Sequence, residues 1–166
     1  RLLSAGPLRA ESHTLLDAPL LHIYSNAPTG DTRPLRDSFK FIRNTLVDLG
    51  EDEFTVGRAH PMIDYSLRNK MILEQAADPD VSVLLLDVVL GHGANLDPAG
   101  ELVPVIKKAA RQVFVVVGVT GTTGDPQNRA QVVEALREAG AHVQLANAPA
   151  TKLAGCIAAQ VARLNR

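Results

Sequence analysis

Val81-Ser-Val-Leu-Leu-Leu-Asp-Val-Val-Leu90 is a nearly unbroken apolar run, and Val113-Phe-Val-Val-Val-Gly-Val119 has the same character further along the chain. Both runs are rich in β-branched residues, and both end in loops that contain glycine. Such runs are typical of parallel strands that are buried on both faces of a sheet. A shorter strand nearer the edge is expected at residues 142–146. Segments 20–24 and 45–49 are plausible strands of the first half.

Segments with apolar residues at helical spacing alternate with these strands. We expect helices at residues 62–77, 98–111, 127–139 and 149–164, and a further one at 8–16. Strands that alternate with helices predict βαβ units, and hence an α/β fold with a doubly wound, mostly parallel sheet and helices on both faces. Segment 27–37 contains two prolines and a glycine and is expected to be a loop. No domain boundary is visible, so residues 1–166 are interpreted as one domain.

The composition excludes several classes of protein. Apolar residues make up 46% of the 166 residues, which is enough for a sizeable core, and the formal net charge of −1 favours neither nucleic acid nor an anionic membrane as a partner. No apolar run approaches the ~20 residues that a membrane-spanning helix needs. The single Cys156 allows no internal disulfide, fits a cytoplasmic protein, and is expected in a helix core. The chain opens at Arg1 without a methionine and is interpreted as a fragment of a longer protein.

Two loops share a local plan. Residues 90–98 and 120–126 each leave a strand, pass through glycines and reach an Asp-Pro pair. An aspartate can cap the free N–H groups of a helix, and proline suits the first helical position. We therefore expect Asp97 and Asp125 to begin the two following helices.

Ligands of open α/β sheets bind outside the carboxyl ends of the strands, where we expect loops 90–97, 119–125 and 146–149 to converge. Glycines let a ligand approach the backbone, whose N–H groups attract anions. The alternative is that these glycines only form tight turns. Neither a P-loop nor a Rossmann glycine pattern occurs. The predicted anion- or substrate-binding residues are Gly91, His92, Gly93, Thr120, Gly121, Thr122, Asp125 and Asn147, together with Arg58.

Two residues are candidates for acid/base catalysis. Asp87 interrupts an apolar strand, so its carboxylate must be functional or hydrogen-bonded, the latter by backbone N–H groups of nearby loops. His60 lies within Gly57-Arg58-Ala59-His60-Pro61-Met62-Ile63-Asp64, where it can perform acid/base work or simply belong to a turn before a helix. No cluster of histidine, cysteine or acidic residues has metal-site spacing, so no metal is predicted.

Three stretches carry a resemblance to a known family. Asp48-Leu-Gly-Glu-Asp-Glu-Phe-Thr-Val-Gly-Arg-Ala-His-Pro-Met-Ile-Asp64 resembles the signature stretch of the FdrA family of acyl-CoA-synthetase-like proteins. Leu85-Leu-Asp-Val-Val-Leu-Gly91 and Gly121-Thr-Thr-Gly-Asp-Pro-Gln127 follow in that family's order, and Leu3-Ser-Ala-Gly-Pro-Leu8 resembles its Gly-Gly-Thr-Leu segment.

The resemblance implies a flavodoxin-like second ligase domain like that of the succinyl-CoA synthetase α subunit, preceded in the full protein by a CoA-binding domain. It also implies CoA or phosphate as ligands, and a link to oxamate carbamoyl transfer in purine breakdown within a multi-subunit enzyme. The synthetases carry a phosphohistidine in a Gly-His-Ala-Gly stretch near the position of 120–127, but this chain has no histidine there. Anion binding without phosphoryl transfer is therefore expected at this loop.

Three functions follow as hypotheses. The first is a ligase-like or acyl- or carbamoyl-transfer subunit that binds an anion at loops 90–97 and 119–127, inactive as an isolated domain. The second is a non-catalytic assembly subunit or homo-oligomer, in which Ala154, Ala158 and Ala162 allow close helix packing. The third is a phosphoacceptor receiver domain, in which Asp87, Thr120 and Lys152 take the Asp, Thr and Lys positions.

Overall fold

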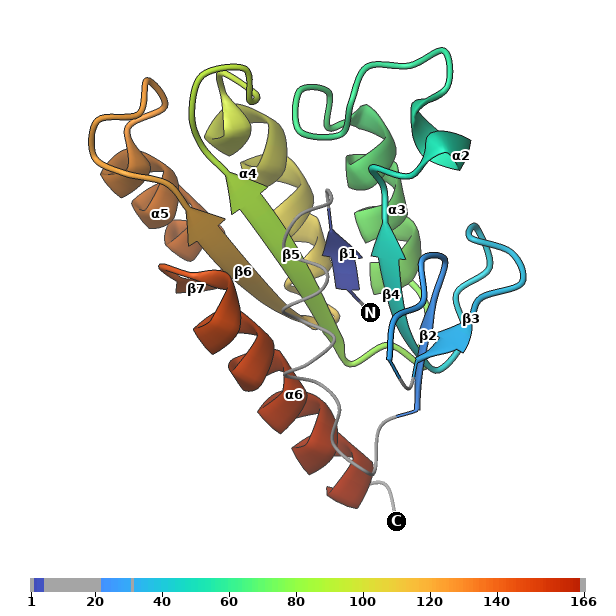
Figure 1. Cartoon of the computed structure of the whole chain (residues 1–166). Coiled ribbons are helices and arrows are strands. Elements are labelled where there is room, and N and C mark those ends of the chain that lie inside the picture. The colour runs from blue at the N-terminus through green and yellow to red at the C-terminus, as the bar shows by residue number, and fades with distance from the viewer. Residues whose placement is uncertain (1, 5–21, 31, 165–166) are drawn as a thin grey trace.

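The sheet of this protein is parallel throughout (Figure 1). The computed structural model describes residues 2–4, 22–30 and 32–164. Within these ranges seven strands lie in the order β3-β2-β4-β1-β5-β6-β7, and every neighbouring pair is parallel. The strands are β1 (Leu2–Ser4), β2 (Ile23–Ser25), β3 (Arg33–Pro34), β4 (Asn44–Asp48), β5 (Val83–Val89), β6 (Phe114–Thr120) and β7 (His142–Gln144).

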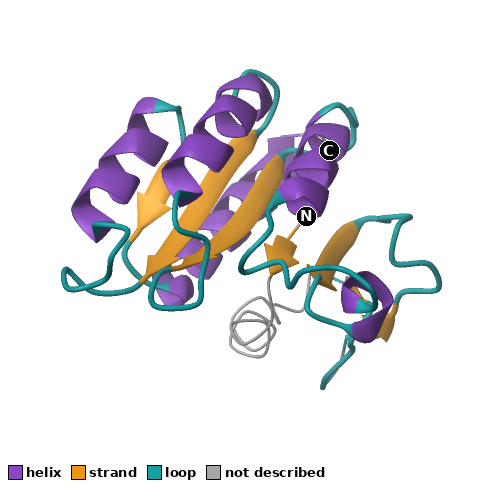
Figure 2. Ribbon diagram, turned by 90° about the horizontal axis from the view of Figure 1, so that it is seen from above, coloured by secondary structure: helices purple, strands orange, loops and turns teal. Residues whose placement is uncertain are grey.

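Helices cover both faces of the sheet (Figure 2). One face packs against α3 (Ser66–Ala76), α4 (Pro98–Ala109) and α5 (Arg129–Glu138), and the other packs against α6 (Asn147–Leu164). Alternate residues of a strand point to opposite faces. Accordingly Leu84 and Leu86 join the larger apolar cluster, while Val83 and Leu85 meet Ala150 and Ala154 of α6. The predicted flavodoxin-like, doubly wound α/β fold is confirmed.

The element boundaries differ from the predicted ones in several places. The predicted helix at 62–77 begins at Ser66, because residues 60–64 form turns in which Ile63 N and Asp64 N donate to His60 O. The helix expected from 149 begins at Asn147, and that expected from 127 begins at Arg129. The predicted loop 27–37 contains the two-residue strand β3, and a short helix α2 (Asp52–Thr55) was not foreseen. The expected helix at 8–16 lies outside the described residues.

The expectation for Cys156 is wrong, because this side chain is exposed. The face of α6 that meets the sheet carries Ala150 and Ala154, with Leu153, Ile157 and Ala158 packed beside them. Two residues beyond Ala154 the helix has turned by about 200°, so Cys156 points away from the sheet.

Successive strands are added first on one side of β1 and then on its other side. The chain reaches β2, β3 and β4 on one side of β1, and α3 then carries it past β1 to β5, β6 and β7 on the other side. The connections around β1 and β5 therefore diverge, which creates a topological switch point. Ligands of open α/β sheets bind beyond the carboxyl ends of the strands at such a point.

Gly118 in β6 lets α6 approach the sheet closely. A Cβ atom at this position would lie 3.3 Å from the Ala150 Cβ and 3.4 Å from the Ala146 carbonyl oxygen. A Gly118→Val substitution is expected to lower the free energy of unfolding by ~2 kcal/mol, because overpacking at this contact forces the helix outward. Urea denaturation measures the change. Gly124→Val is the matched control, because the nearest atom there lies at 3.7 Å, and an equal loss in both variants would contradict the explanation.

Candidate functional site

The side chain of Gln127 joins two of the predicted loops. Its Nε2 donates to the carbonyl oxygens of Gly91 at 2.8 Å and Asn95 at 3.0 Å, and its Oε1 accepts from Gly91 N at 3.0 Å. Gln127 is buried, and Leu90 N also donates to Thr120 O at 2.9 Å. Loops 91–97 and 121–127 therefore form one continuous surface. Two of the three loops that were expected to converge, 90–97 and 119–125, thus lie together, and Gln127 was not among the predicted residues.

Asn95 adds a third segment to this surface. Its backbone N–H donates to Met62 O, and its Nδ2 donates to Ile63 O, both at 2.7 Å. The same amide group donates to Glu101 Oε1 at 2.6 Å, while its Oδ1 accepts from Asp97 N at 2.8 Å. Segment 57–65, which follows α2, is thereby tied to the loop that follows β5.

The two Asp-Pro pairs behave differently. Asp97 caps α4 as predicted, because its Oδ1 accepts from Gly100 N at 2.9 Å. The prediction for Asp125 is wrong, since its carboxylate accepts from Thr122 N inside the loop and Asn128 caps α5 instead. Asn128 has a left-handed backbone with φ of 53°, which asparagine tolerates better than most residues, and its side chain accepts from Gln131 N.

Several backbone donors of the joined loops are unused. The amides of His92, Gly93 and Thr123 make no hydrogen bond with any part of the chain that the structure describes, and all three residues are exposed. Gly121 has φ of 159°, and a Cβ there would lie 2.7 Å from the Leu90 Cβ and 2.8 Å from Asp125 Oδ2. Only glycine therefore fits between the two loops at that point.

The structure does not bring every predicted binding residue to this surface. Asn147 is buried in the first turn of α6, with its Cα 3.4 Å from the position of a Cβ on Gly118. Arg58 lines a separate cleft of about 470 Å³ together with Phe54, Pro61 and Lys70, and no residue of the joined loops takes part in it. Thr120 is half-buried at the end of β6.

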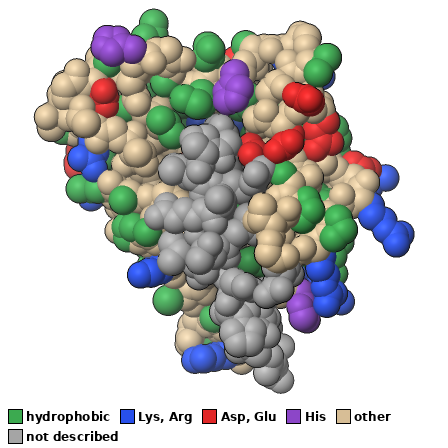
Figure 3. All heavy atoms as spheres, in the orientation of Figure 1, with side chains coloured by type: hydrophobic (Ala, Val, Ile, Leu, Met, Phe, Trp, Pro, Cys, Tyr) green, Lys and Arg blue, Asp and Glu red, His purple; other side chains and the backbone are tan. Residues whose placement is uncertain are grey.

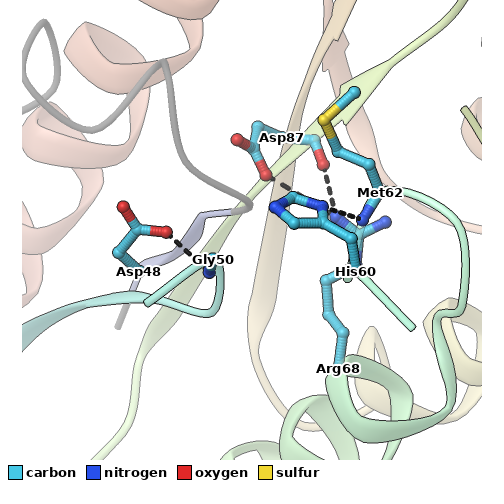
Figure 4. Close-up of polar contacts among 6 residues, drawn as sticks. All are labelled: Asp48, Gly50, His60, Met62, Arg68 and Asp87. Atoms are coloured by element: carbon cyan, nitrogen blue, oxygen red, sulfur yellow. Dashed lines mark hydrogen bonds and ion pairs between the residues drawn. The ribbon is translucent and has the colours of Figure 1, made fainter. Parts of the chain in front are cut away.

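Asp87 has a partner that the sequence analysis did not identify. Arg68 Nη1 donates to the Asp87 carbonyl oxygen at 2.7 Å and lies 3.5 Å from its Oδ1 (Figure 4). The side chains are 1% and 2% exposed. The guanidinium carbon stacks 3.9 Å from the ring centroid of Tyr65. A buried cation from α3 thus lies beside this carboxylate, where backbone N–H groups of neighbouring loops were the expected partners.

Burial raises the pKa of Tyr65 above its ordinary value of 10.0, and the nearby positive charge of Arg68 opposes the shift. The phenol therefore favours its neutral form in the folded protein.

His60 is half-buried, and its Nδ1 accepts from Met62 N at 3.1 Å (Figure 4). A ring nitrogen that accepts a hydrogen bond carries no proton, so the proton of the neutral imidazole is on Nε2. The geometry gives His60 a defined orientation. Its catalytic role, like that of Asp87, stays a prediction.

A polar network that was not predicted lies where β2 and β4 end. Asn26 exchanges two hydrogen bonds with the backbone of Asp48, each 2.9 Å long, and donates to Glu53 Oε1 at 3.0 Å. Ser38 Oγ also donates to Glu53, at 2.6 Å. Acidic side chains gather on the surface over α2 in the same region (Figure 3). The described residues contain no group of acidic, histidine or cysteine side chains suited to a metal ion.

The link made by Gln127 leads to a prediction. A Gln127→Ala substitution leaves the Gly91 N–H and two carbonyl oxygens without their partner, which is expected to cost about 1–3 kcal/mol. Amide hydrogen exchange at Gly91 should also become faster, because the loops separate more easily. Gln131→Ala, at an exposed position of α5, is the control. Unchanged exchange at Gly91 in the Gln127 variant would show that this side chain does not hold the loops together.

The raised pKa of Tyr65 leads to a second prediction. In the unfolded chain this phenol ionises near pH 10, whereas in the folded chain it stays protonated to a higher pH. The contribution of the buried phenol to the free energy of unfolding is therefore fully present below pH 10 and decreases as the pH rises above it. The free energy of unfolding should therefore fall less steeply above pH 10 in a Tyr65→Phe variant than in the unmodified chain. Denaturant titrations between pH 8 and about 11 measure the slopes. Tyr24→Phe is the control, and identical slopes in all three proteins would contradict the expectation.

Comparison with known proteins adds the family. A model of the CoA-ligase family matches residues 11–157. The uncharacterized protein YahF of Escherichia coli K12 is 36% identical over 125 residues, which cover 71% of this chain and 24% of YahF. The chain thus spans about a quarter of that relative's length. No described helix is long and apolar enough to cross a membrane. The chain belongs to the CoA-ligase family and forms an acyl-CoA-synthetase-like domain.

Proposed function

We propose that this chain is the ligase domain of an FdrA-like subunit that takes part in acyl or carbamoyl transfer. In this proposal it binds an anionic group of its substrate on the surface formed by loops 91–97 and 121–127. CoA or phosphate supplies that group, or the substrate itself carries it. A cytoplasmic location and a role in carbamoyl chemistry of purine breakdown belong to the same proposal.

The unused backbone donors of the joined loops carry this proposal. His92 and Gly93 of the first loop and Thr123 of the second are exposed residues whose backbone amides have no partner among the described residues. The hydroxyl groups of Thr122 and Thr123 belong to the second loop. Backbone N–H groups that converge in a glycine-rich loop attract anions. Gln127 holds the two loops together before any ligand arrives, which limits the ordering cost of binding.

The residues of the second loop restrict the chemistry. Residues 121–127 contain no histidine, so no imidazole of this loop can accept a phosphoryl group. What remains is binding, orientation and stabilisation of negative charge that develops on an acyl or carbamoyl oxygen. His92 is the imidazole of the first loop, and it is exposed between two glycines.

Asp125 sets a condition on the ligand. Its carboxylate already accepts from Thr122 N and lies between the loops, 4.0 Å from the position of a Cβ on Gly91. A bound anion experiences repulsion from this charge. An Asp125→Asn substitution removes the charge and keeps an oxygen that accepts from Thr122. It is expected to tighten binding by ~1 kcal/mol, about fivefold.

Isothermal titration with carbamoyl phosphate, CoA, inorganic phosphate and oxamate measures this effect. Asp80→Asn makes the same charge change in the turn before β5, at the opposite edge of the sheet, and should leave affinity unchanged. If none of the four compounds binds, or if both variants change affinity equally, the anion site on these loops is refuted.

A second candidate is a role in assembly with partner subunits or with another copy of the chain. Ile63 and Leu96 are 52% and 78% exposed on segments that Asn95 joins, which favours contact with another protein surface. The small residues of α6 support this role less than Ile63 and Leu96 do, because Ala154 is buried against the chain's own sheet and is not available to a partner. Size-exclusion chromatography of a Leu96→Asp variant tests this candidate, which an unchanged elution profile would refute.

The receiver-domain hypothesis gains no support. Asp87 is 2% exposed and paired with Arg68, so its carboxylate is not accessible to a phosphodonor in this conformation. Lys152 lies on the surface of α6, where a receiver domain would need it at the end of a strand.

A further inference from the structure

Arg68 uses only part of its hydrogen-bonding capacity. Nη1 holds the carbonyl and carboxylate oxygens of Asp87, but Nε and Nη2 have no hydrogen-bond partner although the side chain is 1% exposed. Burial raises the pKa of Tyr65, while the charge of Arg68 and a side-chain hydrogen-bonding interaction with it lower that pKa, and Nε and Nη2 still lack a hydrogen-bond partner. Buried donors are rarely left in this state, and each costs about 1–3 kcal/mol.

The two unused donors have a specific geometry. Nε and Nη2 form one edge of the planar guanidinium, and their N–H bonds point the same way, which matches the two oxygens of a carboxylate. Asp87 binds Nη1, so the group is held in place while the Nε and Nη2 edge has no hydrogen-bond acceptor. Tyr65 stacks against the plane of the group and further restricts its rotation.

Position and charge indicate what binds there. Arg68 reaches the carbonyl of Asp87, the residue after Leu86, which pairs with Leu3 of β1. This point lies at the carboxyl half of β5, at the topological switch point where ligands of such sheets bind. The charges of Arg68 and Asp87 cancel, so a bound monoanion leaves one net negative charge and a phosphate dianion leaves two. Burial therefore favours the monoanion.

We propose that the Nε and Nη2 edge of Arg68 is a preformed receptor for the carboxylate of a small carboxylic acid. Asp87 and Tyr65 position the guanidinium, and the ligand carboxylate accepts both N–H groups side by side. The ligand enters when residues 57–61, which form no regular helix or strand and precede the part of segment 57–65 that Asn95 holds, move away from α3. This site is separate from loops 91–97 and 121–127, so either proposal can fail without the other.

The experiment observes the Nε–H group of Arg68 directly. Proton–nitrogen NMR spectra of the isotope-labelled chain are recorded while sodium acetate is added at constant ionic strength against sodium chloride. Through-bond assignment identifies the Arg68 signal without any substitution, and Arg68→Lys, which keeps the charge but lacks the paired donors, should remove the signal. A saturable downfield shift of the Nε proton with acetate is expected.

Control variants separate this site from general anion effects. Arg111→Lys, in the turn before β6, and Arg163→Lys, in the last turn of α6, alter exposed arginines outside segment 57–65 and should leave the acetate response intact. Absence of a saturable shift, an equal shift with chloride, or a response to inorganic phosphate but not to acetate would overturn the proposal.

Discussion

The seven strands that the structure describes all run in the same direction, and this constraint organises the rest of the molecule. Every strand delivers its following loop to one edge of the sheet, so residues far apart in the chain meet there. Both faces of the central strands are covered by helices, and the strand interiors are accordingly apolar. Polar groups concentrate where the strands end, and among them Asp48, Asp87, Asn95 and Gln127 are buried.

Side chains take over the role of the backbone at this edge. Leu86 of β5 pairs with Leu3 of β1, and the next carbonyl of β5, that of Asp87, accepts from Arg68. Gln127 does the same for Gly91, whose N–H and carbonyl both bond to one carboxamide as they would to a neighbouring strand. Asn26 repeats the pattern with both backbone groups of Asp48. The edge of the sheet is thus extended by amide and guanidinium groups, whose length and orientation depend on side-chain packing.

The apolar periodicity of the chain was enough to predict the parallel sheet and the helices on both faces, and it placed loops 90–97 and 119–125 at the same edge. Loop 146–149 was expected to join them, but Asn147 is buried in the first turn of α6. Local signals also identified the cap at Asp97, because capping involves residues three positions apart. They could not identify Arg68 as the partner of Asp87, or Gln127 as the link between loops. Those pairs are separated by 19 and 36 positions, and an arginine or glutamine on a helix flank is usually exposed. Cys156 was misplaced because the small residues of α6 do not show which face meets the sheet.

The left-handed residue Asn128 has an effect on loop length. Because α5 begins at Arg129 and not directly after Asp125, an extra turn separates β6 from the helix, with Asn128 N donating to Asp125 O at 3.1 Å. Gln127 lies in that turn, outside any helix, where its side chain is free to extend inward under the neighbouring loop. If the helix began at the Asp-Pro pair, residue 127 would be fixed in its first turn, with its direction set by the helix. The spatial relation between loops 91–97 and 121–127 therefore depends on the residue at which α5 begins. A deletion of one residue between 125 and 128 would separate the two loops even with every glycine retained.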